Sequence, residues 1–214
     1  MSAALEALRR RFDGHQPGLL GARNEYAVLC PLLEQPDGVH LLFEVRAAQL
    51  RQGGEVCFPG GRLESQETPA ECALRETEEE LSIPRSQIQL LGAPDFICNQ
   101  RGFLLRPYLG LISPEGYAAI SPSSAEVAEV FTVPFAFFQN TAPELYSYDL
   151  LPQLPEGFPY EAVGISQDYP WSRGKVDVPV WYWQGHVIWG KMCIRDSQES
   201  AQDYLHMARQ YRKG

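Results

Sequence analysis

Residues 54–83 read GEVCFPGGRLESQETPAECALRETEEELSI, and this segment is the most informative part of the chain. Val and Phe alternate with Glu and Cys over residues 55–58, which is the period of a half-buried strand. The Pro-Gly-Gly sequence at 59–61 ends that strand and allows backbone or a ligand to approach closely. The segment therefore predicts a short strand, a glycine turn, a loop and a helix rich in carboxylates.

The predicted helix has a well-marked start. Thr68 is a suitable N-cap, Pro69 suits the first helical position, and Glu71 stands at the spacing of a capping box. We expect the helix to pack on the core through one stripe of side chains. At about 100° per residue this stripe comprises Ala70, Ala73, Leu74, Thr77 and Leu81.

Three glutamates, Glu76, Glu79 and Glu80, form a second face of the same helix. Their spacings of three and four residues make them neighbours, and like charges so placed repel by roughly a few tenths of a kcal/mol per pair. A cation above the carboxylates would remove this repulsion. The simpler alternative is that the glutamates form the solvated face of an amphipathic helix. The helix alone leaves both interpretations open.

A wider pattern favours the cation. It resembles the signature of the Nudix hydrolases at six positions: Gly61, Glu67, Arg75, Glu76, Glu79 and Glu80. The resemblance implies that the last three of these hold Mg²⁺ or Mn²⁺, and that Arg75 braces the loop through a carboxylate. Ser82 stands where the family usually has glycine after the helix, and Thr77 replaces a large aliphatic residue. Neither departure falls on a ligand position.

A second pattern precedes the glycine turn. Arg46 is followed by Ala, Arg51 stands four residues after that Ala, and residues 54–61 read GEVCFPGG. This order resembles the extra motif of the coenzyme A diphosphatases among Nudix enzymes. In this chain the gap after Arg51 is one residue shorter, and Phe43-Glu44 replaces a threonine-containing pair. The substrate-binding residues that this resemblance implies are Arg46, Arg51, Phe58, Gly60 and Gly61.

The two arginines have two interpretations. Planar guanidinium groups are well suited to an anionic substrate, which is the role that the resemblance implies. The alternative is that Arg46 and Arg51 are ordinary surface arginines beside a strand.

Composition limits the class of partner. A net charge of −9 argues against general binding to nucleic acid or membranes, where basic patches are the rule. A bound divalent metal would reconcile this charge with a phosphate-bearing substrate. The five cysteines are scattered without zinc-ligand spacing, so we expect buried thiols in a reducing cytoplasm. The N-terminus is too charged for a secretory signal, and a cytoplasmic location is expected.

The segments before and after the helix predict a mixed α/β chain. Residues 5–12 have helical spacing of apolar residues, and Gly14 ends that helix. Residues 26–33 have the pattern of a buried strand, which Pro31 places near an edge or a bulge. A turn is expected at 35–38. Further strands are expected at residues 39–46, 88–91, 96–98, 102–112 and 125–135, with loops at 113–116 and 121–124.

The C-terminal third allows more than one interpretation. Residues 140–180 are rich in Pro, Gly, Tyr and Trp, which suits either an aromatic-lined insertion over a pocket or dimer contact, or an irregular cap. Residues 178–183 and 186–190 predict a hairpin across Gln184-Gly185. Residues 191–214 have only a weak apolar stripe, and we expect a loosely packed helix rather than a second domain.

These elements predict an α/β fold, a Nudix-type α/β/α sandwich with a mixed sheet and helices on both faces. We expect one Nudix domain over residues 1–214, with a core at about 20–190 and a tail at 191–214. The resemblance implies metal-dependent hydrolysis of the diphosphate bond of coenzyme A or acyl-CoA. The products would be 3′,5′-ADP and 4′-phosphopantetheine or its acyl form.

The expected mechanism follows from the glutamates. Metal ions would bridge the diphosphate and lower the pKa of an attacking water. Glu79 or the loop residue Glu126 would take the proton of that water, and the sequence does not choose between them. Glu76 and Arg75 complete the expected catalytic set.

Two other functions stay open. The nearer one is the same chemistry on ADP-ribose or a dinucleotide. The other is a non-catalytic Nudix domain that senses a nucleotide, against which the intact glutamates argue, because a sensor needs no metal cluster. The expected partner is a small molecule, and a homodimer is a further expectation from the aromatic segment.

Overall fold

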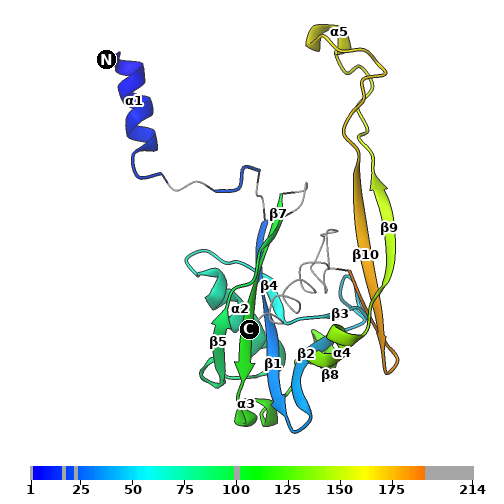
Figure 1. Cartoon of the computed structure of the whole chain (residues 1–214). Coiled ribbons are helices and arrows are strands. Elements are labelled where there is room, and N and C mark those ends of the chain that lie inside the picture. Colours follow the sequence, from blue (N-terminus) through cyan, green and yellow to red (C-terminus); the bar gives the residue numbers. More distant parts are fainter. Residues whose placement is uncertain (1, 16–17, 22–23, 99–101, 191–214) are drawn as a thin grey trace.

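The computed structural model describes residues 2–15, 18–21, 24–98 and 102–190, which form two sheets flanked by helices (Figure 1). The N-terminal half contains α1 (Ala3–Phe12), β1 (Asn24–Gln35), β2 (Gly38–Arg46), β3 (Val56–Cys57), β4 (Gly60–Arg62), α2 (Pro69–Leu81), the 3₁₀ turn η1 (Arg85–Gln87) and β5 (Ile88–Gly92). The C-terminal half contains β6 (Ile97–Cys98), β7 (Phe103–Ile112), α3 (Pro114–Ala118), β8 (Val127–Pro134), α4 (Phe135–Asn140), β9 (Glu144–Leu150), α5 (Tyr160–Val163), β10 (Gly174–Trp183) and β11 (His186–Trp189).

The larger sheet is mixed, as predicted. Its main order is β3-β2-β1-β7-β5, with β4 paired to β1, β6 paired to β7 and β8 paired to β2. The β1–β7 pair is parallel, from Asn24 opposite Phe103 to Leu32 opposite Leu111, whereas the other pairs in this sheet are antiparallel. The sheet therefore has β1 at its centre.

Alternate residues of β1 pack against different layers. Ala27 and Leu29 belong to the core cluster that α2 covers, and Val28 and Cys30 belong to the cluster on the opposite face. That second cluster includes side chains of α4, β10 and β11. The predicted layered α/β architecture is confirmed, although strands of the second sheet help α4 to cover the second face.

The position of Pro31 corrects one prediction. A place near an edge or a bulge was expected because proline cannot donate a ladder hydrogen bond, but β1 is central. The backbone N–H of Leu29 donates to Pro59 O on the β4 side. Backbone N–H groups of residues two apart on a strand lie on the same side, so the nitrogen of Pro31 is on this side as well. Pro31 therefore stands where that side of β1 changes partner from β4 to β2 and needs no donor.

The second sheet replaces the insertion or cap expected at 140–180. Its order is β11-β10-β9, and β9 and β10 extend away from the larger sheet as a two-stranded arm with α5 at its far end (Figure 1). The predicted hairpin is confirmed, with Trp183 opposite His186 across Gln184-Gly185. Aromatic rings at the far end of the arm contact one another edge-on, among them Phe158 and Trp171.

Three further expectations can be compared with the structure. The loop expected at 113–116 is wrong, because the Ser113 side chain accepts a hydrogen bond from Gly116 N and caps α3. The strand expected at 125–135 ends at Pro134, where α4 begins. The helical tail predicted at 191–214 lies outside the described residues, so the single domain over 1–214 stays a prediction.

The N-terminal helix is confirmed but has no part in the core. None of its residues is buried, and Figure 1 shows α1 standing away from the larger sheet. Leu5, Leu8 and Phe12 are all more than half exposed, at 52%, 53% and 62%. Among the residues that the structure describes, no helix combines the length and the apolar character needed to cross a bilayer.

Candidate active site

Helix α2 carries most of the predicted site, and both of its ends are fixed. The Thr68 hydroxyl accepts from Glu71 N at 3.3 Å, and the Glu71 carboxylate accepts from Thr68 N at 2.7 Å, which is the predicted capping box. Ser82 ends the helix in the left-handed region at φ 57°, and its hydroxyl donates to Ser121 O at 2.8 Å. This bond offsets part of the strain that a non-glycine residue has there.

Arg75 ties the loop before α2 to the helix. Its Nε and Nη2 donate to the two oxygens of Glu67 at 3.0 and 2.9 Å, and Nη2 also donates to Arg62 O at 3.3 Å. Its Nη1 donates to Glu76 at 2.9 Å and to Glu79 at 3.1 Å. The paired guanidinium lowers the pKa of Glu67 to about 2. Arg75 therefore positions other residues and has few donors left for a substrate.

Glu80 is the most buried of the three helix glutamates, at 1% exposure. Its Oε2 accepts a hydrogen bond from Gly60 N at 2.9 Å, which joins α2 to the glycine turn. Burial is the main cause that raises its pKa to about 9, and the negative charges of Glu44, Glu76 and Glu126 contribute further. The neutral acid is therefore favoured at neutral pH, and a nearby cation would favour the ionised form.

The two glycines of the turn are required by close contacts. A Cβ on Gly60 would lie 2.5 Å from Ala27 O on β1, too close for any side chain. A Cβ on Gly61 would overlap the carboxylate of Glu76. The Gly-Gly pair therefore lets β4 pair with β1 and leaves room for an acidic side chain, so the turn serves the carboxylates as well as the backbone.

Glu44 on β2 is a buried acidic residue that sequence reasoning missed. Its side chain is 0% exposed, Cys57 Sγ donates to its Oε1 at 3.2 Å, and its Oε2 has no hydrogen-bond partner. Burial raises its pKa well above the ordinary value, and Cys57 and Glu126 act in the same direction. Its departure from the threonine-containing pair of the resembled motif was the available signal.

The loop between β2 and β3 brings the predicted arginines to the same region. Ala47 N donates to Glu126 O at 2.8 Å, and the Gln49 side chain donates to Ala125 O at 2.9 Å. Arg46 is 7% exposed, and its positive charge lowers the pKa of Glu44. Arg46 is thus not the surface arginine of the simpler interpretation. Arg51 is exposed on the loop itself.

The model of the NUDIX domain family matches residues 23–152, more than half of the chain. The chain belongs to the Nudix hydrolase family. The uncharacterized Nudix hydrolase NudL of Photorhabdus laumondii is 34% identical over 178 residues, which cover 81% of this chain and 82% of that protein. The peroxisomal coenzyme A diphosphatase NUDT7 of Mus musculus is 33% identical over 137 residues, which cover 63% of this chain and 56% of the mouse protein.

Among solved structures, the Nudix hydrolase RenU of M. smegmatis aligns with 54% of this chain and 73% of its own, at 24% identity and a TM-score of 0.47. The Nudix resemblance of the sequence is confirmed by the family match. Enzymes of this family use divalent metal ions.

The acidic residues of this Nudix hydrolase have the right chemistry for a divalent ion. Carboxylate oxygens are the ligands that hard cations prefer. Glu44, Glu76 and Glu126 each raise the pKa of Glu80, and among the described residues the buried Oε2 of Glu44 has no hydrogen-bond partner, so ionising these side chains together is unfavourable without a cation. A divalent cation would neutralise the negative charge of the ionised cluster.

The same residues are not arranged as direct ligands in this conformation. Across the described residues, no three side chains of acidic, histidine or cysteine type converge on one point as an ion would require. The reason is visible in the hydrogen bonds, because Arg75 holds Glu76 and Glu79 while Gly60 N holds Glu80. To bind an ion directly, Glu76 and Glu79 would have to turn away from Arg75.

The burial of Phe58 argues against its predicted role. Phe58 was expected to bind substrate, but its ring is 2% exposed and stacks on Phe43 at 4.7 Å between centroids, so it is a core residue with no surface for a ligand. The Glu79 side chain is 56% exposed, and its carboxylate accepts from Arg75 Nη1. His40, to which no role was assigned, bonds Asp37 and Thr132 on the sheet.

Proposed function

We propose that this Nudix hydrolase cleaves the diphosphate bond of coenzyme A or acyl-CoA, using Mg²⁺ or Mn²⁺, to 3′,5′-ADP and (acyl-)4′-phosphopantetheine. The observation that supports it most is the hydrogen bonding of the Arg46–Arg51 loop to the segment of Glu126, beside the acidic cluster. The name of the mouse relative, a coenzyme A diphosphatase, supports the same substrate.

The proposed reaction assigns a role to each acidic residue. Glu76, Glu79 and Glu80 would hold the metal, which when bound neutralises diphosphate charge and makes a water more acidic. Gly60 N fixes the Glu80 carboxylate, and Arg75 fixes the loop and the helix relative to each other. Glu126 and Glu79 are both exposed, and either carboxylate can take the proton of the attacking water.

The two arginines, Arg46 and Arg51, are the reason for proposing coenzyme A as the substrate. The 3′-phosphate of coenzyme A is the anionic group that distinguishes it from 3′-dephospho-coenzyme A and from ADP-ribose. A charged hydrogen bond from arginine to phosphate contributes about 1.5–3 kcal/mol, which corresponds to roughly a tenfold to hundredfold preference. Arg51 is the exposed one of the pair and thus the candidate for this contact.

The test compares kcat/KM for coenzyme A, 3′-dephospho-coenzyme A and ADP-ribose, with and without divalent metal. Coenzyme A is expected to be hydrolysed most efficiently, and Arg51→Ala is expected to remove most of its advantage over the dephospho form. Arg85→Ala is the matched control, because Arg85 is exposed and pairs with Glu78. Equal kcat/KM for the first two substrates, or a preference for ADP-ribose, would contradict the proposal.

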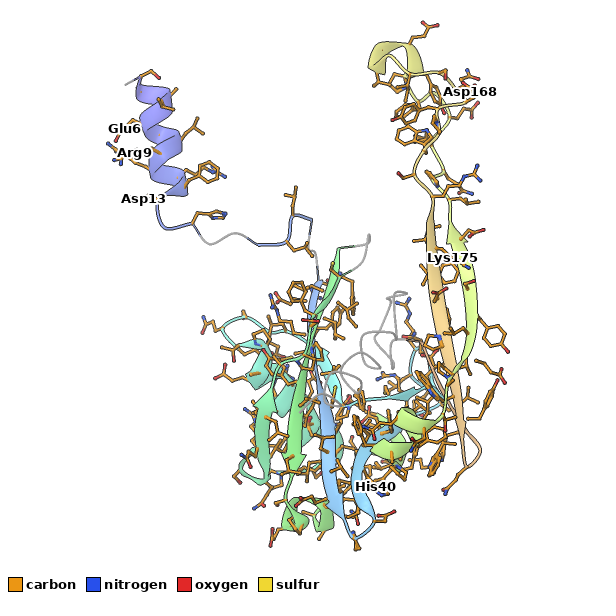
Figure 2. The ribbon with its side chains drawn as sticks, in the orientation of Figure 1. Glu6, Arg9, Asp13, His40, Asp168 and Lys175 are labelled. Carbon is orange, nitrogen blue, oxygen red and sulfur yellow. The ribbon has the colours of Figure 1, made fainter. Side chains whose placement is uncertain are left out.

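We also propose that the active form is a homodimer in which α1 of one copy packs on the arm of the other. Helix α1 has an exposed apolar stripe beside Arg9, Arg10 and Arg11. The arm also exposes apolar side chains, including Leu145 and Tyr146, and its acidic residues outnumber its basic ones. Figure 2 labels Arg9 on α1, and Asp168 and Lys175 on the arm. Opposite charge and unpartnered apolar surface thus occur on two elements of the same chain.

A further inference from the structure

Glu44 is a buried acidic residue that the proposed reaction leaves unused. One of its oxygens accepts from the Cys57 thiol at 3.2 Å, and the other, Oε2, is equally buried and has no hydrogen-bond partner. A buried carboxylate oxygen without a partner is costly, and native proteins contain few of them. Such an oxygen implies a partner that the residues described by the structure do not supply.

The surroundings of Glu44 indicate what this partner is. Residues two apart on a strand share a face, and Leu42 belongs to the cluster that α2 covers, so Glu44 faces α2 as well. The negative charges of Glu80 on α2 and of Glu126 before β8 interact with it, and Arg46 opposes them. Ionisation of all three acidic side chains beside a single guanidinium would leave an excess of negative charge, which a divalent cation would balance.

We propose that Glu44 is a further acidic residue of the metal site, with its Oε2 directed at the divalent ion or at a water bound to that ion. The inference rests on the proposed metal-dependent function. It extends the set of acidic residues around the metal from helix α2 to strand β2. Oxygen donors of this kind suit Mg²⁺ and Mn²⁺. Because the resembled motif has a threonine-containing pair in place of Phe43-Glu44, the added carboxylate belongs to this chain's own sequence.

A purely structural Glu44 would behave differently from a metal-site residue. As a protonated acid held by Cys57, it would affect the stability of the fold and leave the affinity for metal unchanged. As a metal-site residue, Glu44 lowers the stability of the metal-free protein by charge repulsion and raises the stability of the metal-bound protein. Metal affinity therefore separates the two roles without any assay of hydrolysis.

The experiment uses the full chain after removal of metal with a chelator. Mn²⁺ is titrated in, free Mn²⁺ is followed by electron paramagnetic resonance, and the melting temperature is recorded with and without Mn²⁺. We expect Glu44→Gln to bind Mn²⁺ at least about tenfold more weakly and to lose most of the rise in melting temperature. The matched control is Glu78→Gln on the same helix as Glu80, where the carboxylate pairs with Arg85 at 2.8 Å.

Parent-like Mn²⁺ affinity in a folded Glu44→Gln protein would overturn the inference. If this variant does not fold, Glu44→Asp keeps the charge and shortens the side chain. It is expected to bind Mn²⁺ about tenfold more weakly, because the shorter side chain moves the carboxylate away from the ion. Unchanged affinity in that variant overturns the inference too. A parent that binds Mn²⁺ but does not hydrolyse coenzyme A refutes only the substrate, whereas a parent that binds no Mn²⁺ refutes both proposals.

Discussion

At the level of single residues, the candidate site combines exposed carboxylates with two that are held away from water, Glu44 and Glu80. Glu80 is the clearest case, because burial raises its pKa to about 9 while Gly60 N fixes the direction of its Oε2. In water-free surroundings the neutral acid is preferred, and a nearby cation reverses that preference. A cation bound beside Glu80 would therefore favour the ionised form of its carboxylate.

Replacement of Glu80 by Gln tests this. The amide keeps the shape and its carbonyl can still accept from Gly60 N, so the fold is expected to stay intact. Loss of the charge is expected to weaken metal binding and to lower kcat by about 10²–10³-fold. Steady-state kinetics at saturating Mg²⁺, with circular dichroism as the check on folding, measure this. A kcat within a few-fold of the parent would remove Glu80 from the site.

Sequence reasoning found the residues of the site that lie in one continuous pattern. Glu76, Glu79 and Glu80 were predicted because helical spacing makes them neighbours within about one turn and because the wider sequence pattern resembles the Nudix signature. Glu44 was missed because its partners come from other elements of the fold. The sequence of β2 also does not indicate that both faces of this strand are covered. The same cause explains the error at Phe58, whose burial depends on stacking against a ring from another strand.

At the level of elements, the loop before α2 depends on one ion pair. Arg75 holds both oxygens of Glu67, and Glu64 N donates to the same carboxylate at 2.7 Å. These bonds favour the ionised form and lower the pKa of Glu67 from an ordinary 4.5 to about 2. The loop is thus held against the helix only while Glu67 is charged.

This pKa shift fixes a pH dependence. Because the folded pKa is the lower one, the stabilisation is complete above pH 4.5 and is lost as the pH falls toward 2. Glu67→Gln is expected to lower the free energy of unfolding by about 2 kcal/mol at neutral pH and by much less near pH 2. Denaturant titrations at several pH values measure this difference, with the exposed Glu64→Gln as the control. A difference that does not shrink in acid would contradict the assignment.

Elements were predicted well where local signals agree, and poorly where neighbours decide. The capping box and the stripe of α2 are local, and the helix begins where they predict. The strand β9 and residues 174–177 of β10 were missed, and β9 lacks the period of a half-buried strand because most of its side chains are exposed. Pro31 was misplaced for a related reason, since only the pairing pattern shows that its side of β1 changes partner.

At the level of the whole molecule, two elements leave most of their side chains exposed. Helix α1 buries none of its residues, and β9 is an edge strand whose side chains are mostly exposed. A two-stranded ribbon is marginally stable alone in water, so the arm gains stability from anything that covers it. A second copy of the chain supplies such a cover in the proposed dimer.

Removal of residues 1–14 tests the dimer. The parent is expected to have twice the mass of one chain by light scattering after size exclusion, and the shortened protein the mass of one chain. Replacement of Arg9, Arg10 and Arg11 by Ala is expected to weaken the dimer and reduce its dependence on salt. A parent that is monomeric at high concentration would refute the proposal without affecting the site.

The parallel pairing of β1 with β7 also governs the order in which the molecule can be assembled. Residues 24–32 of β1 pair with 103–111, so the acidic helix and its loop are synthesised before the strand that lies beside β1. Until β7 leaves the ribosome, one side of the central strand has unpaired backbone groups and is open to other chains. A nascent chain that stalls between β5 and β7 thus carries the complete acidic helix on an unfinished sheet, and this is the stage at which a chaperone would be most needed.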